Sequence, residues 1–151
     1  MKLTQEDILI TVQKILEAMM EGKRQNPKIS QNPFIAAIVN LETEEYVIET
    51  FNSEFMFEEL GSNFEALHSI FGAPIIIRGA ETWYSGVSET LLEVMRPGQD
   101  PDRKEMLIVQ AHSKLGTAFA YVFFKQIGNM VKFEDIQIKM ISRKIPFGEL
   151  K

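Results

Sequence analysis

Three stretches of the sequence are apolar at odd and even positions alike, and this feature limits the possible folds more than any other. They cover residues 34–39, 106–111 and 118–124. Successive side chains of a strand point to opposite faces of a sheet, so strands of this kind need cover on both faces. We therefore expect the three stretches to be interior strands of a sheet that has other structure packed on it.

The clearest helix is expected close to the N-terminus. Thr4 and Asp7 match a capping pattern in which each side chain bonds to the backbone of the other residue, and apolar residues then recur at spacings of three and four over residues 8–20. Gly22 is expected to end this helix, because glycine readily adopts the backbone conformation that follows a last helical turn. Two shorter helices are expected over residues 62–71 and 88–95.

Six apolar or β-branched runs predict the strands of the sheet. They cover residues 34–39, 46–51, 74–83, 106–111, 117–126 and 130 onward. In the last run the apolar positions change from odd, at Val131 and Phe133, to even, at Ile136 and beyond. One residue near Glu134 must therefore form a bulge or a bend, since a regular strand keeps its parity.

The order of these elements predicts the fold class. It is α-β-β-α-β-α-β-β-β, and links of hairpin length outnumber helical crossovers. We therefore expect an α+β fold, with a mainly antiparallel six-stranded sheet and about three helices packed on it. With 151 residues, the chain is expected to form a single domain over residues 1–151.

Composition and charge exclude several classes of protein. The chain has no cysteine, so disulfides and cysteine-ligated metals are excluded, and its net charge is −5. No nucleic-acid partner is expected, because no group of basic residues exceeds a pair. The apolar run over residues 115–124 has about half the length of a membrane-spanning helix, so no membrane association is expected. The acidic start of the chain does not fit an export signal, and we expect a cytoplasmic protein.

The common catalytic and cofactor motifs are missing from the sequence. It contains no G-x-S-x-G, no phosphate-binding glycine-rich motif and no H-E-x-x-H. Glu54, Glu58 and Glu59 are spaced like ligands of a divalent cation, although acidic residues on a surface turn are the commoner origin of such a pattern. We expect no metal and no cofactor.

Glu81 and Trp83 are the residues that most suggest a site. If their strand keeps its period of two, Glu81 shares a face with Ile75, Ile77 and Trp83, and its carboxylate lies in apolar surroundings. Such a carboxylate is a candidate general acid or base, and the indole of Trp83 is a candidate contact for a ligand. In the alternative, Gly79 marks a bulge that returns Glu81 to solvent.

Two histidines and one arginine complete the candidates. His112 ends an apolar strand, where it is either a proton carrier facing a carboxylate or an imidazole bonded to backbone or water. His68 follows Glu65 by one turn on a predicted helix, either as an ion pair or as a partly exposed residue. Arg103, in a charged loop, is either a clamp for a carboxylate or phosphate or a solvated side chain.

Two segments resemble a pattern found in small uncharacterised bacterial proteins, which combine an acid-x-Trp strand with a P-D-R-x-E loop. The segments are Ala80-Glu81-Thr82-Trp83 and, after a variable stretch, Pro101-Asp102-Arg103-Lys104-Glu105 with an apolar strand behind it. The resemblance covers about a quarter of the chain. It implies that Glu81, Trp83 and Arg103 belong to one site, and it implies no activity.

Two hypotheses of function follow. The leading one is a non-enzymatic domain that binds a small ligand near Trp83 or a protein partner. It would be a homodimer if a second subunit covers the part of the sheet that three helices leave open. The alternative is a small acid–base enzyme acting on a metabolite, with Glu81 as acid or base, Arg103 as anion clamp and His112 as proton relay. The alternative requires these three residues to meet in one pocket.

Overall fold

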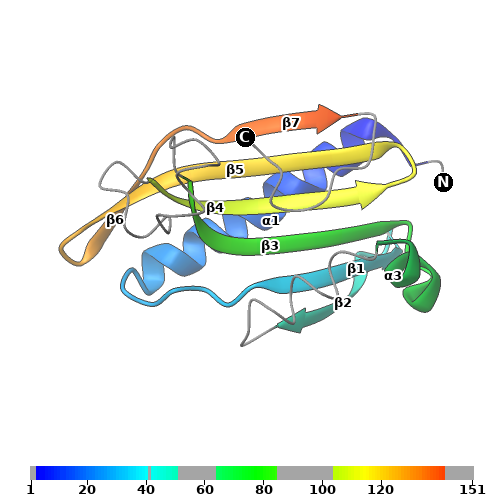
Figure 1. Cartoon of the computed structure of the whole chain (residues 1–151), viewed down its shortest axis with the longest axis horizontal. Coiled ribbons are helices and arrows are strands. Elements are labelled where there is room, and N and C mark those ends of the chain that lie inside the picture. The colour runs from blue at the N-terminus through cyan, green and yellow to red at the C-terminus, as the bar shows by residue number, and fades with distance from the viewer. Residues whose placement is uncertain (1–2, 41, 51–63, 85–103, 142–151) are drawn as a thin grey trace, which may run out of the picture.

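The computed structural model of this protein describes residues 3–40, 42–50, 64–84 and 104–141 (Figure 1). The described residues form two helices and seven strands, α1 (Gln5–Gln25), β1 (Phe34–Asn40), β2 (Glu45–Thr50), α3 (Phe64–Phe71), β3 (Ile75–Tyr84), β4 (Lys104–Ser113), β5 (Gly116–Ile127), β6 (Met130–Phe133) and β7 (Gln137–Ile141). The expected α+β class is confirmed. The third expected helix, over residues 88–95, lies outside the described residues.

The strands form one open antiparallel sheet. Along it the order is β2-β1-β3-β4-β5-β6, and β7 also pairs with β5. The strands β1, β4 and β5 contain the three stretches that are apolar at both parities, and each has a neighbouring strand on both sides. The expectation that these stretches are interior strands is therefore confirmed.

The sheet has seven described strands instead of the expected six, because the last predicted strand is divided. β6 pairs with β5 up to Phe133 opposite Phe124, and β7 resumes the pairing with Gln137 opposite Tyr121. Between these two pairs β5 advances by three residues, from Phe124 to Tyr121, whereas the partner segment advances by four, from Phe133 to Gln137. The one extra residue is what defines a bulge. The irregularity expected near Glu134 from the change of apolar parity is confirmed.

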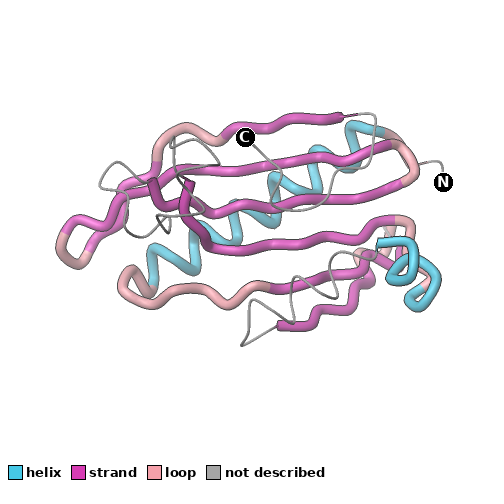
Figure 2. Tube along the Cα trace, in the orientation of Figure 1, coloured by secondary structure: helices cyan, strands magenta, loops and turns pink. Residues whose placement is uncertain are grey.

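The two helices pack on opposite faces of the sheet. Figure 2 shows α1 running obliquely across one side of the strands, and α3 contacts β1 and β3. The core on the α1 side is the larger, and its fully buried members include Ile8, Val12, Leu16, Ile75, Ile77, Leu107 and Val109. The core on the α3 side includes Ile35, Ala37, Leu67, Ala73, Ile76 and Ile108. Both faces of the central strands are buried, as their sequence requires.

Helix α1 begins with the predicted cap. Thr4 Oγ1 accepts a hydrogen bond from the N–H of Asp7, and Asp7 Oδ2 accepts one from the N–H of Thr4, both at 3.1 Å. This reciprocal bonding satisfies two backbone donors that the first helical turn leaves free. Neither α1 nor α3 is long and apolar enough to cross a bilayer.

The prediction that Gly22 ends α1 is wrong, because the helix continues to Gln25. Glycine at this position leaves room for the chain that returns toward the sheet. A Cβ on residue 22 would lie 2.9 Å from Nε2 of Gln31, which donates a hydrogen bond to the carbonyl oxygen of Met19 at 2.8 Å. The additional helical residues place Lys23 on α1, over the sheet.

Gly79 is the residue of β3 that receives an aromatic ring from β1. It stands opposite Phe34 in the antiparallel pairing of the two strands. A Cβ on residue 79 would overlap the ring of Phe34. The ring therefore covers the glycine backbone, a packing that stabilises glycine within a strand.

Gly79→Ala should lower the free energy of unfolding by about 1–3 kcal/mol, because the added methyl group displaces the Phe34 ring from a packed position. Urea denaturation measures the loss. In a Phe34→Ala background the same substitution should cost much less, since the ring is gone. An equal cost in both backgrounds would show that the ring does not limit residue 79.

Candidate functional site

Glu81 lies on the α1 side of the sheet. The pairing of β3 with β4 continues through Gly79 and Glu81 without a register shift, so β3 has no bulge at this point. Glu81 therefore shares a face with Ile75 and Ile77, as a period of two requires. Its side chain is only 11% exposed. A carboxylate in this position needs a partner, because an isolated charge is costly to remove from water.

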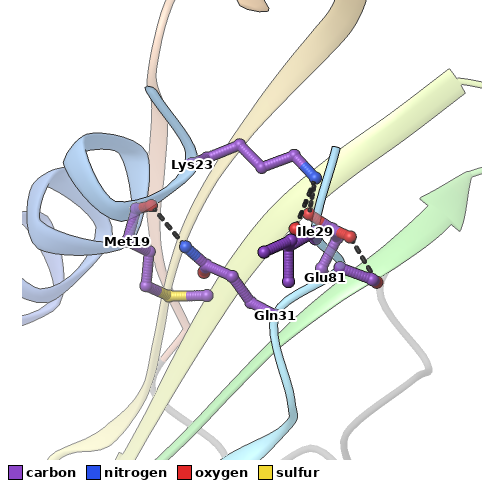
Figure 3. Close-up of polar contacts among 6 residues, drawn as sticks. Met19, Lys23, Ile29, Gln31 and Glu81 are labelled. Atoms are coloured by element: carbon purple, nitrogen blue, oxygen red, sulfur yellow. Dashed lines mark hydrogen bonds and ion pairs between the residues drawn. The ribbon is translucent and has the colours of Figure 1, made fainter. Parts of the chain in front are cut away.

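The partner of the Glu81 carboxylate is the ammonium group of Lys23 (Figure 3). Lys23 Nζ lies 2.8 Å from Glu81 Oε1 in an ion pair. The same ammonium donates to the backbone oxygen of Ile29 at 3.1 Å and lies 5.1 Å from the ring centre of Phe124. Ser30 Oγ donates to Glu81 Oε2 at 2.5 Å.

These contacts join three segments that are distant in the sequence. Lys23 belongs to the last turn of α1, Ile29 and Ser30 to the connection that follows the helix, and Glu81 to β3. Both oxygens of the carboxylate are engaged by other parts of the chain. Glu81 therefore holds α1 and its connection onto the sheet.

His112 points to the opposite face of the sheet from Glu81. Glu81 is opposite Leu107 on β4, and His112 follows Leu107 on the same strand by an odd number of positions. The hypothesis that Glu81 and His112 meet in one pocket is therefore wrong. Arg103 lies outside the described residues, and so does the side chain of Trp83.

The two histidines of the chain meet on the α3 side. His68 Nε2 lies 3.0 Å from His112 Nδ1, and the rings are tilted with their centres 5.3 Å apart. His68 Nδ1 lies 2.7 Å from the carbonyl oxygen of Ala73, just beyond the end of α3. His112 is fully buried and His68 is half-buried. Helix α3 is thus fixed to the centre of the sheet through an imidazole pair.

The contacts of His68 define where its protons are. The carbonyl oxygen of Ala73 can only accept, so His68 Nδ1 carries a hydrogen and donates it. In the neutral ring Nε2 is then an acceptor, and it receives the Nδ1–H of His112.

Further polar residues lie beside His112 on this face, and we call the set of Arg78, Gln110, His112 and Thr117 the polar row. Arg78 is opposite Gln110 across β3 and β4, and His112 is opposite Thr117 across β4 and β5. All four are at most 1% exposed. Each is engaged in polar or ring contacts. Because Gln110 and His112 are two positions apart on β4, the four side chains occupy adjacent rungs of one face.

The sequence pattern did not single out Arg78, Gln110 or Thr117. A signal for the first two exists, since each interrupts a run of apolar residues in a strand that is otherwise buried on both faces. No comparable signal exists for the contact between His68 and His112, which are 44 positions apart. Their contact depends on where α3 packs on the sheet.

The described residues hold no group of three histidine, aspartate or glutamate side chains that could bind a metal ion. Comparisons with protein-family models, with curated proteins and with solved structures found no match to this chain. The polar row and the histidine pair are therefore the groups whose chemistry bears on function.

Removing one charge of the Lys23–Glu81 pair should destabilise the protein more than removing both. In Glu81→Gln the ammonium of Lys23 stays buried without a counter-charge, and we expect a loss of about 3 kcal/mol in the free energy of unfolding. The double variant Lys23→Met/Glu81→Gln should recover most of this loss. Urea denaturation of the wild type, Lys23→Met, Glu81→Gln and the double variant measures the difference, and strictly additive losses would contradict a direct pairing.

In their neutral forms, His68 and His112 should both carry hydrogen on Nδ1. The Ala73 carbonyl oxygen can only accept from His68 Nδ1, and His68 Nε2 must then accept from His112 Nδ1. Long-range proton–nitrogen NMR correlation spectra at alkaline pH identify the tautomer of each ring. His112→Ala provides the assignment, because it removes one of only two histidine signals. An Nε2–H tautomer of His68 would be incompatible with the contact of its Nδ1 with the Ala73 carbonyl oxygen.

Proposed function

We propose that this chain is a non-enzymatic domain that binds a small anionic ligand, a carboxylate or phosphate compound, at the polar row. The observation that carries the proposal is the placement of Arg78 directly opposite Gln110, next to the rung of His112, on a buried sheet face. Among the described residues, the buried polar groups on the other face are the Lys23–Glu81 pair and Ser113. Polar recognition groups are thus concentrated on the α3 side.

The donor set suits an anion. Arg78 offers up to five N–H donors in a planar fork that matches a carboxylate or phosphate, and the amide of Gln110 adds two more. Bonds from a charged donor to an anion are about twice as strong as neutral ones, and more so away from water. A ligand here must compete with the contacts that the polar row already makes. The site should therefore select anions that form strong hydrogen bonds, because a weaker acceptor would not replace those contacts.

Binding is favoured over acid–base catalysis by the separation of the candidate groups. The enzymatic alternative needs Glu81 and His112 on one reacting group, and they occupy opposite faces of the sheet. The contacts described for His68 are to a backbone oxygen and to His112. The pair thus positions α3 and shapes the polar row.

We place the domain in the cytoplasm as part of the same proposal.

A thermal-shift panel of small carboxylates and phosphates tests the proposal. A compound at 100 times its dissociation constant should stabilise the protein by about 2.7 kcal/mol. In Gln110→Glu a carboxylate is built in opposite Arg78, so the variant should fold with unchanged or higher stability and should lose the response to the compound.

The matched control is Lys23→Met/Glu81→Gln, which removes both charges on the other face and should leave the response intact. A response lost in the control and kept in Gln110→Glu would place the ligand on the α1 side. A panel without any stabilising anion would refute the proposed function.

A further inference from the structure

The edge strand β2 exposes apolar side chains on both of its faces. Tyr46, Val47 and Ile48 are 58%, 47% and 48% exposed. Tyr46 and Ile48 stand opposite Ile38 and Ala36 and belong to the α1 side, whereas Val47 belongs to the α3 side. An outer strand that met only water would be expected to carry polar residues on its solvent-facing side.

The outer edge of β2 is also suited to main-chain pairing. Among the strands the structure describes, β2 has β1 as its neighbour and stands at the end of the sheet. Proteins usually protect such an edge with proline, charged side chains (lysine above all) or a bulge. From Tyr46 to Thr50 the strand has no proline, lysine or bulge, its one charged residue is Glu49, and its pairing with β1 is regular over this segment.

We propose that β2 pairs antiparallel with β2 of a second copy of this chain, which joins two sheets into one across a twofold axis. Twofold dimers are the commonest symmetric oligomers, and their interfaces are self-complementary. The outer edge of β2 is separated by β1 from β3, the nearest strand of the polar row, so this pairing stands independently of ligand binding.

The sequence of β2 selects one register for this pairing. A twofold axis normal to the sheet places one residue of β2 opposite the same residue of the second copy. In this strand of six residues, two choices of that central residue, Val47 or Ile48, give five cross-strand pairs each. Centred on Val47, the dimer would set Glu45 opposite Glu49 twice, and like charges directly opposite are destabilising. Centred on Ile48, it has no pair of acidic residues. The second register is therefore the one we assign.

In the register centred on Ile48, residues of good strand propensity meet on the α1 side. Ile48 stands opposite Ile48 of the second copy, and Tyr46 stands opposite Thr50 in both directions. Pairs of β-branched and aromatic residues are among the stabilising cross-strand pairs. Each copy carries a net charge of −5. Association should therefore tighten as salt screens the repulsion, whereas a basic peptide on the same edge would bind more weakly with salt.

Single-cysteine variants test the register, because the chain has no cysteine of its own. In Ile48→Cys the two thiols face each other at a distance that a disulfide spans, so mild oxidation should give a covalent dimer in high yield. In Val47→Cys the two positions are diagonal neighbours, about 7–8 Å apart, and should not cross-link. Met130→Cys, at a position 73% exposed in the β6 hairpin, measures collisional cross-linking.

Sedimentation velocity of the unmodified chain at rising concentration should show a monomer–dimer equilibrium that shifts toward the dimer with added salt. Ile48→Lys places two charges against each other on the axis and should leave a monomer, while Met130→Lys should still dimerise. A chain that stays monomeric at every concentration, or a dimer that Ile48→Lys leaves intact, would overturn the proposal. Preferential cross-linking of Val47→Cys would overturn the assigned register.

Discussion

Burial of the central strands on both faces is the constraint on which the rest of this structure depends. β4 has structure on both sides, and its odd and even positions therefore both face protein. Polar side chains can occupy such an interior only with partners. The free energy lost by burying one polar group without a hydrogen bond is as large as the stabilisation from several surface contacts. The buried polar residues are accordingly engaged, Lys23 with Glu81 and His112 with His68.

The two faces use their polar groups differently. On the α1 side one ion pair fixes the end of a long helix and the connection after it, in surroundings that are otherwise apolar. On the α3 side an arginine, an amide, a hydroxyl and two imidazoles lie on adjacent rungs or on the short helix above them. We assign ligand recognition to the second arrangement in our proposal, because it offers several donors on one face of the sheet. The first arrangement contributes to the position of the helix.

Features that depend on neighbouring residues were predictable. The capping pair of Thr4 and Asp7, the interior strands and the irregularity near Glu134 all follow from spacing along the chain. The shared face of Glu81 with Ile75 also follows, once β3 is known to be regular. Gly22 was misjudged, because its role is to admit Gln31, and that contact exists only when the chain has turned back.

The sequence by itself determined the α+β class, the two-sided burial of the sheet and the alternation of faces within each regular strand. Only the tertiary structure decided that Lys23 neutralises Glu81, that His68 reaches His112 and that Glu81 and His112 are separated by the sheet. The physical reason is the range of the interactions. Periodicity and capping are set within a few residues of the chain, whereas side-chain partners depend on strand register and on where each helix packs, which the whole core decides together.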